Sequence, residues 1–222
     1  MQALRTTSLP DAVYDAVRRS IVSIEYAPGQ ALTETAIALR FGVARPTAKA
    51  AIERLVSDGL LRRQANRAAT VAELSRDDID DLYRNRSMVE QSAMRNLAAE
   101  GTVPAAALTA HRELLAHVAS DDRIALVQDD IAFHRSLVGA QHSPRLARMH
   151  DLIMGEIELC TGQVQSHRLI TPEDVAAQHQ RILDAITAGN ADLAATLAGS
   201  HVDGVRDRLL AKWDLDHGQE SS

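Results

Sequence analysis

Residues 37–63 read IALRFGVARPTAKAAIERLVSDGLLRR and contain two runs with helical periodicity on either side of a tight turn at Gly42. In the second run apolar residues recur with the spacing of a helix that packs one face on a neighbour, at Ala48, Ala51, Ile52 and Leu55. Its opposite face is polar and cationic, with Arg45, Thr47, Lys49 and Arg54. This pattern fits a helix-turn-helix, whose second helix enters the DNA major groove, although a helical hairpin with a solvated face is the alternative.

The flanking sequence extends this prediction to a winged helix. Asp58-Gly59 ends the second helix, and residues 60–74 (LLRRQANRAATVAEL) form two β-prone runs around a polar turn, as expected for a wing with Arg67 at its tip. Residues 11–25 predict a further helix that covers the pair, with an apolar stripe that ends at Ile24. Thr33 is expected to cap the next helix.

Chain length and charge indicate two parts. A chain of 222 residues is too long for one winged helix, so we expect residues 75–222 to form a second domain beside a DNA-binding domain at 1–74. The net charge is −6, but residues 1–74 carry +3 and the remainder −9. The positive part therefore coincides with the predicted helix-turn-helix, which is consistent with salt-dependent DNA binding.

Cysteine content and hydropathy indicate where the protein works. Cys160 is the single cysteine, so an intrachain disulfide is excluded, and we expect a buried thiol. No apolar run approaches the ~20 residues that span a bilayer, and the first residues lack the apolar segment of a signal peptide. The sequence therefore predicts a soluble, cytoplasmic protein without a membrane partner.

The second part is predicted to be helical throughout. Aromatic residues make up only 3% of the chain, and alanine is abundant, which suits close helix packing. Helical periodicity covers residues 77–100, 104–119, 124–140, 145–165, 172–188 and 191–213, with breaks at glycine, proline and acidic clusters. The fold class is thus mainly α: an N-terminal winged helix-turn-helix and a C-terminal antiparallel bundle of six or seven helices.

One constellation in the predicted bundle has metal-binding chemistry. Asp130 and His134 are i, i+4 neighbours near an apolar stripe, His179 lies on a later helix, and His201 lies on the helix after that. Such a set is typical of divalent sites in bundle cores, and three imidazoles suit zinc, nickel, copper or manganese better than magnesium. The alternative is an ordinary Asp–His pair. The other histidines are expected at the surface or in caps, without a role: His111, His117, His142, His150, His167 and His217.

Residues 9–73 resemble the amino-terminal domain of the GntR family of bacterial repressors. The matching motifs are Val13-Tyr14, Pro28-Gly29, Leu32-Thr33-Glu34 and Gly42-Val43-Ala44-Arg45. The resemblance implies binding to double-stranded operator DNA. The residues we expect at that interface are Thr35, Arg45, Thr47, Lys49, Arg54, Asn66 and Arg67.

The sequence departs from the family pattern at the second helix. Ala44 replaces the usual Ser or Thr before the turn arginine, and Lys49-Ala50 replaces the usual Arg-Glu pair. The wing's usual glycine is replaced within Asn66-Arg67-Ala68. Because lysine lacks the bidentate fork of arginine, we expect an altered operator preference rather than a loss of DNA binding.

Residues 77–213 look like the FCD ligand-binding domain of the FadR branch of that family. The landmarks are Arg86-x-x-x-Glu90, Asp130-x-x-x-His134, the run His179–Ile186 with Gly189-Asn190, and His201. In the metal-binding members one aspartate and three histidines hold a divalent ion. By position these are Asp130, His134, His179 and His201, and zinc is the first choice of ion, ahead of nickel, manganese or copper.

The resemblance also implies a function. Such proteins commonly sense organic or sugar acids, so we expect a small carboxylate effector at the metal, with Arg86 as a carboxylate partner; an intrahelical pair with Glu90 is the alternative for Arg86. The implied protein is a homodimeric transcriptional regulator, as a family expectation a repressor, and not an enzyme. The competing interpretations are a regulator whose effector is the ion itself and a metalloenzyme fused to a DNA-binding domain.

Overall fold

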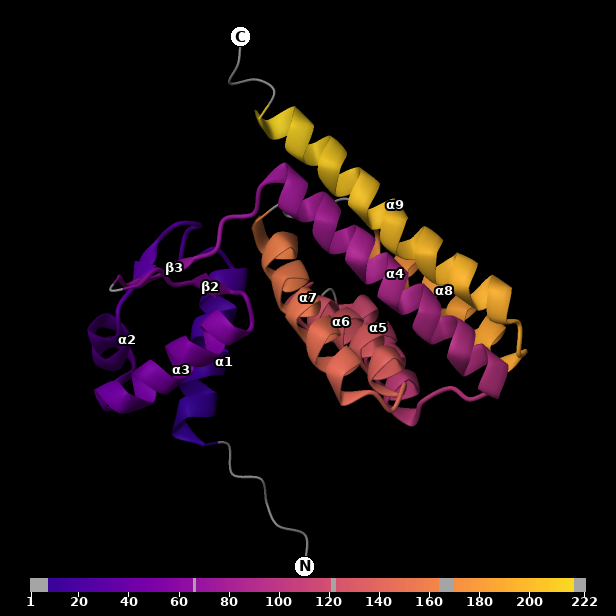
Figure 1. The fold of residues 1–222 in the computed structure, drawn as a ribbon, viewed down its shortest axis with the longest axis horizontal. Coiled ribbons are helices and arrows are strands. Elements are labelled where there is room, and N and C mark those ends of the chain that lie inside the picture. Colours follow the sequence, from indigo (N-terminus) through magenta and orange to yellow (C-terminus); the bar gives the residue numbers. More distant parts are fainter. Residues whose placement is uncertain (1–7, 66, 121–122, 164–169, 218–222) are drawn as a thin grey trace, which may run out of the picture. The chain divides into compact units, whose positions relative to one another are not determined.

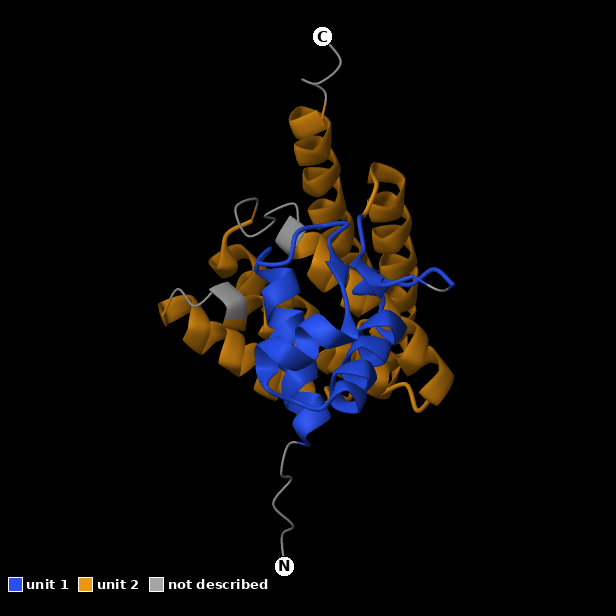
Figure 2. Cartoon of the chain, turned by 90° about the vertical axis from the view of Figure 1, so that its left-hand side faces the viewer, with its two compact units in different colours: residues 1–73 blue, residues 74–222 orange. Residues whose placement is uncertain are grey.

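The chain folds into two compact units, residues 1–73 and 74–222, which Figure 2 shows in different colours. The computed structural model describes residues 8–65, 67–120, 123–163 and 170–217. Both units are mainly helical, as the sequence predicts, and the small sheet lies in unit 1. Within the described ranges, no helix has the length and apolarity needed to cross a bilayer.

Unit 1 is a winged helix-turn-helix. It contains helices α1 (Leu9–Val22), α2 (Glu34–Phe41) and α3 (Arg45–Ser57). Strands β1 (Ala31–Leu32), β2 (Leu61–Arg62) and β3 (Ala69–Val71) form an antiparallel sheet in the order β1-β3-β2. The β2–β3 hairpin is the predicted wing. Figure 1 shows β2 and β3 next to each other, beside the helices of unit 1.

Local sequence signals explain the turn between α2 and α3. Thr33 caps α2 as predicted, because its hydroxyl accepts from the backbone N–H of Ala36. Gly42 ends α2 with a φ of 63°, a left-handed conformation that glycine adopts without a Cβ clash. The stripe of α3 is buried as expected, with Ala48, Ala51, Ile52 and Leu55 at most 1% exposed.

The first helix is shorter than its apolar stripe predicts. It ends at Val22, and Ile24 is 39% exposed with a φ of 61°. A cluster of turn interactions takes over at this point, because the Ser20 hydroxyl donates to Glu25 and the Tyr26 N–H bonds back to the Ser20 carbonyl. The helix therefore ends two residues before the last residue of the predicted apolar stripe, Ile24.

Unit 2 is an antiparallel helical bundle. Its helices are α4 (Arg76–Glu100), α5 (Ala105–Ser120), α6 (Arg123–Gly139), α7 (Pro144–Gln163), α8 (Pro172–Thr187) and α9 (Ala191–His217). The two longest, α4 and α9, lie side by side (Figure 1). The start of α4 is joined to the end of α9 by the ion pair of Arg76 with Asp214, and the end of α4 is joined to the start of α9 by that of Arg95 with Asp192. The two helices are therefore antiparallel.

The bundle core is built mostly from small and aliphatic side chains. Five helices contribute to one buried cluster, for example through Met94, Ala107, Phe133, Ile186 and Ala198. Alanines let the helix axes approach closely, in agreement with the composition. Cys160 is fully buried as expected, and burial raises the pKa of its thiol to about 12, so the thiol is protonated at neutral pH.

Candidate metal centre and candidate DNA interface

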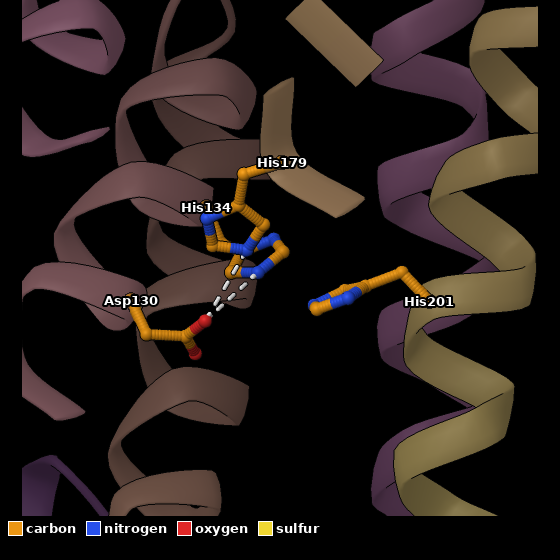
Figure 3. A group of neighbouring side chains, drawn as sticks. All are labelled: Asp130, His134, His179 and His201. Atoms are coloured by element: carbon orange, nitrogen blue, oxygen red, sulfur yellow. Dashed lines mark ion pairs between the residues drawn. The ribbon is translucent and has the colours of Figure 1, made fainter. Parts of the chain in front are cut away.

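The four residues singled out in the sequence meet inside unit 2. Asp130 and His134 lie one turn apart on α6, His179 comes from α8, and His201 comes from α9 (Figure 3). Each residue offers one ligand atom, and these atoms all lie within 4.8 Å of one another. Helices α6, α8 and α9 therefore bring one carboxylate and three imidazoles to a common point.

Burial divides the four residues into two kinds. The side chains of His134 and His179 are at most 2% exposed and His201 is 4% exposed, whereas the Asp130 side chain is 26% exposed. One carboxylate oxygen, Oδ1, lies 3.3 Å from Nε2 of His179 and 3.7 Å from Nε2 of His134. Asp130 is thus the most exposed member of the cluster.

The protein environment sets the charges of the cluster. Burial lowers the pKa of His179 to about 4 and, together with the neighbouring imidazoles, lowers that of His201 well below its usual value. Burial by itself raises the pKa of Asp130, but His134 and His179 hold it well below the usual range. At neutral pH the cluster therefore presents an ionised carboxylate and at least two neutral imidazoles, which are the ligand forms that bind metal ions.

Two of the histidines are oriented by partners behind them. Nδ1 of His134 lies 2.7 Å from Oε2 of Glu90, and Nδ1 of His201 lies 2.7 Å from Oε1 of Gln178. Carboxylate and amide oxygens are acceptors, so each Nδ1 carries a proton, and in the neutral form of each ring Nε2 is left with its lone pair. Both imidazoles consequently offer Nε2 to the cluster, as His179 does toward Asp130.

Glu90 connects this cluster to a buried charge network. Its Oε1 accepts from Nε of Arg86 at 2.8 Å and lies 3.1 Å from Nε2 of His150. Glu90 is fully buried, and burial alone raises its pKa, but Arg86 and His134 hold that pKa well below the usual value. A buried ionised carboxylate is thus shared by basic groups from α4, α6 and α7.

The structure corrects the prediction that the remaining histidines are surface or cap residues. His150 is 1% exposed and His111 is 5% exposed, and both lie in the bundle interior. In α5 the spacing signal is present in the sequence, because His111 follows Ala107 and Ala110 and precedes Leu114 on one buried stripe. A histidine ring packs well in a core when its nitrogens find partners, as His111 does with Gln180 and His150 with Glu90. His142 and His217 are exposed as expected, and His167 lies outside the described residues.

Arg86 makes the intrahelical pair that was the alternative to an effector role. The pair with Glu90 is buried, and both side chains are at most 2% exposed. Among the described residues, however, Nη2 of Arg86 has no hydrogen-bond partner. The guanidinium therefore keeps one free donor in the buried network that includes the partner of His134.

The donor set fits a divalent transition metal. Three imidazole nitrogens and one carboxylate oxygen are the ligand types that such ions prefer over magnesium or calcium. Among the described residues, the buried Nε2 atoms of His134 and His179 have no hydrogen-bond partner, and both lie within 3.7 Å of the Asp130 carboxylate. The site therefore has the donor set of a metal centre, and oxygens lie behind two of its histidines.

In unit 1, the candidate DNA interface lies at the amino-terminal end of α3. Arg45 and Lys49 have side chains that are 70% and 54% exposed, one turn apart. Within the described part of the chain, each forms a long ion pair, Arg45 with Glu34 at 3.9 Å and Lys49 with Glu53 at 3.6 Å. Pairs of this kind contribute little, so both cations are free to exchange a carboxylate for a phosphate.

The other predicted DNA-contacting residues differ in their surroundings. Thr35 and Arg67 are exposed, and Thr47 is half-buried in the first turn of α3. Arg54 is engaged within unit 1, since it pairs with Asp11 at 2.8 Å and lies 3.9 Å above the Tyr14 ring. Asn66 lies outside the described residues. Arg63, which the sequence analysis does not select, forms an ion pair at 3.9 Å with Glu34, the same carboxylate that pairs with Arg45.

Comparison with known proteins gives matches to both units. The model of bacterial regulatory proteins of the gntR family matches residues 9–71, and the FCD domain model matches residues 81–204. A transcriptional regulator of Bacillus subtilis, YdhC, is 24% identical over 94% of this chain and 93% of its own length. The probable D-xylose utilization operon transcriptional repressor of Paenarthrobacter nicotinovorans is 27% identical over 90% of this chain and 88% of its own.

Solved structures share the fold. A GntR regulator from Rhodococcus sp. RHA1 aligns with a TM-score of 0.77 and 24% identity, covering 91% of this chain and 97% of its own. The Escherichia coli protein McbR/YncC aligns with a TM-score of 0.74 and 19% identity, covering 94% and 100%.

A winged helix-turn-helix followed by an all-helical ligand-binding type of domain defines a DNA-binding transcriptional regulator. The matched relatives and both family models are regulators rather than enzymes. The chain belongs to the GntR family and carries the FCD domain that is typical of the FadR branch.

Proposed function

We propose that this regulator is a homodimeric repressor whose binding to operator DNA is modulated by a small carboxylate bound at a divalent metal in unit 2. The observation that carries the proposal is the convergence of Asp130 with three buried histidines whose ligand atoms lie within 4.8 Å of one another. Glu90 and Gln178 lie behind the Nδ1 atoms of His134 and His201, which turns their Nε2 atoms toward the cluster, and a structural histidine cluster would not require that orientation.

Asp130, His134, His179 and His201 would hold the ion, and zinc is our first choice for it. When bound, the ion supplies a Lewis-acidic centre with positions beyond the four protein ligands. Asp130 contributes one negative charge, and the charge of Glu90 is offset by Arg86 at 2.8 Å. These residues leave a divalent site with a net positive charge, which favours an anionic ligand over a neutral one.

Arg86 would contribute to effector binding through its free Nη2. A buried guanidinium donor without a partner is costly, and a carboxylate is the acceptor that its geometry fits best. Asp130 is the most exposed side chain of the cluster, so we expect the effector to enter beside it. Small organic acids and sugar acids combine the required carboxylate with additional hydroxyl donors.

DNA recognition would use two copies of unit 1. One α3 helix presents Arg45 and Lys49, which are too few groups for a long operator, so a dimer with two such helices fits a pseudo-palindromic site. Thr35, Thr47 and the wing residues Asn66 and Arg67 would add contacts to phosphates or the minor groove. One relative is named as a repressor, which supports the proposed sign of regulation.

The test uses the purified full chain and its own promoter DNA. Metal is first removed with a chelator, then titrated, and candidate acids are added to the loaded protein while DNA affinity is followed. The substitutions His134→Ala and His179→Ala should weaken metal binding and leave chelated protein able to bind DNA. Arg45→Ala and Lys49→Ala should weaken DNA binding, lower its salt dependence by about one unit of slope each, and leave metal affinity unchanged.

The outcomes separate the alternatives. A protein that neither retains metal after gentle purification nor binds it on titration contradicts the metal assignment. If metal alone sets the affinity for DNA and no acid changes it, the ion is itself the effector. This second function is favoured by the completeness of the four-residue ligand set, which needs no further group to hold the ion.

A further inference from the structure

The three histidines of the candidate metal centre differ in what lies behind them. Nδ1 of His201 is hydrogen-bonded to Oε1 of Gln178 at 2.7 Å, and Nδ1 of His134 lies 2.7 Å from Oε2 of Glu90 in an ion pair whose hydrogen-bond geometry is poor. His179, in contrast, is fully buried, and its Nδ1 has no hydrogen-bond partner among the described residues. If Nε2 of His179 binds a metal, its Nδ1 carries a proton, and a buried N–H without an acceptor is costly.

His111 has a buried nitrogen that can accept a hydrogen bond and lacks a donor. Its Nε2 lies 3.1 Å from Oε1 of Gln180, and Nε2 of Gln180 in turn donates to Oδ1 of Asp184 at 2.7 Å. The contact with a carboxylate fixes the amide orientation, because the opposite orientation would place two oxygens together. His111 must therefore donate from Nε2, which makes its Nδ1 an acceptor, and this Nδ1 also has no hydrogen-bond partner in the described part of the chain.

The two rings lie near each other, so the Nδ1 proton of a metal-bound His179 could be donated to Nδ1 of His111. The ring centroids of His111 and His179 are 6.1 Å apart at an interplanar angle of 55°. This separation permits a hydrogen bond through one water molecule, or a direct bond after a small ring movement. The ring of Phe133 is stacked on the His179 ring, with the two centroids 3.9 Å apart. This contact prevents the His179 ring from tilting out of its plane, so the ring can move only within that plane.

We infer that His111 is a positioning residue for the metal centre and accepts the Nδ1 proton of His179, directly or through one water, when Nε2 of His179 binds the ion. This inference rests on the proposed metal site. Each ligand histidine then has its own outer partner: Glu90 for His134, Gln178 for His201 and His111 for His179. A chain from Asp184 through Gln180 and His111 ties the α8 ligand to α5, a helix that carries none of the four ligands.

The test compares two substitutions that differ in the acceptor. His111→Leu introduces an apolar side chain of similar size without an acceptor, whereas His111→Asn places an acceptor oxygen near the position of Nδ1. Gln180→Ala removes the group that fixes the tautomer of His111. His142→Asn is the matched control, because it removes an exposed histidine at a φ of 51°, which asparagine tolerates.

The first readout is the affinity of the full chain for Co²⁺ and Zn²⁺, measured by competition with a chelator. We expect His111→Leu to weaken binding by about 10- to 100-fold, the usual effect of losing an outer partner of a metal-bound histidine. His111→Asn should recover most of this loss, Gln180→Ala should weaken binding less than His111→Leu, and His142→Asn should equal the unsubstituted chain.

The second readout is the ¹⁵N spectrum of the imidazoles in the Zn²⁺-loaded protein, which a purely structural role would not change. We expect His179 as an Nδ1-protonated ring and His111 as an Nε2-protonated ring with a hydrogen-bonded Nδ1. Unchanged metal affinity in His111→Leu, or His111 protonated on Nδ1, would overturn the inference while leaving the metal site intact.

The design remains decisive if His111→Leu does not fold, because Gln180→Ala alters an exposed side chain and His111→Asn retains the acceptor. Metal binding by neither the unsubstituted chain nor any variant would instead contradict the proposed function. Failure of the two proposals is therefore distinguishable.

Discussion

Among single residues, Glu90 has the most demanding environment that we describe, because its fully buried carboxylate is shared by Arg86, His134 and His150. Substitution of Glu90 by glutamine removes the charge and leaves the Arg86 guanidinium buried without a counter-ion. Breaking a buried pair in this way typically costs about 3–5 kcal/mol. We expect a loss of this size in the free energy of unfolding of unit 2, measured by urea titration in the presence of a chelator.

An exposed pair on the same unit provides the control for Glu90→Gln. Lys212 and Asp216 form an i, i+4 pair near the end of α9, with side chains 32% and 47% exposed. Asp216→Asn should change stability by no more than about 0.5 kcal/mol, as is usual for such pairs. Equal effects of the two substitutions would show that the Glu90 network is not a major source of stability.

The sequence reveals some of the contacts in the candidate metal centre and not others. The spacing of Asp130 and His134 places them on one helix face. Helical periodicity places His179 and His201 on later helices of the same bundle, so the sequence already indicates a candidate site, and the family resemblance then implies that these residues are its ligands. The resemblance included the Arg86–Glu90 motif, yet nothing in the spacing showed that Glu90 faces His134. That contact depends on how α4 and α6 are rotated against each other, and helical periodicity gives the buried face of each helix but not its partner across the core.

Among the elements, α3 begins without a side-chain cap. Ala44 occupies the N-cap position with an extended backbone and makes no side-chain hydrogen bond, so the first N–H groups of α3 are left without a side-chain acceptor. We expect Ala44→Ser to stabilise unit 1 by about 1 kcal/mol, the usual contribution of such a cap. Urea unfolding followed by far-UV circular dichroism measures the change.

The opposite substitution at the preceding helix is the matched control. Thr33 caps α2 through a 3.1 Å bond from the Ala36 N–H, so Thr33→Ala should destabilise unit 1 by about the same amount. Destabilisation by Ala44→Ser would indicate that the tight turn at Gly42 leaves no room for the hydroxyl. These caps also explain why element bounds were predictable: Thr33, Gly42 and Asp58-Gly59 are local signals, whereas the early end of α1 depends on contacts of Ser20 with residues of the following turn.

For the whole molecule, metal removal should affect unit 2 selectively. A ligand that binds only the folded state at 100 times its Kd stabilises that state by about 2.7 kcal/mol. The single tryptophan, Trp213, lies on α9 in unit 2, so its fluorescence reports the unfolding of that unit. We expect Zn²⁺ to raise the urea midpoint seen by Trp213, and we expect no such rise in His134→Ala. A rise of equal size in that variant would place the stabilising ion elsewhere.

The proposed function further requires that the two units be coupled, and coupling has a consequence that can be measured from either side. If a bound ion and effector change the affinity for operator DNA by some factor, operator DNA must change the affinity for them by the same factor. Such factors are typically about 5- to 150-fold. We therefore expect the metal affinity of the full chain, measured by chelator competition, to shift on addition of its promoter DNA, and to shift again when the effector acid is present. Random DNA of equal length is the control, and Lys49→Ala should reduce the shift at a given operator concentration, because less of the protein is bound. Identical metal affinity with and without operator, at saturating DNA, would mean that Asp130 and its three histidines hold an ion that stabilises the bundle without regulating unit 1.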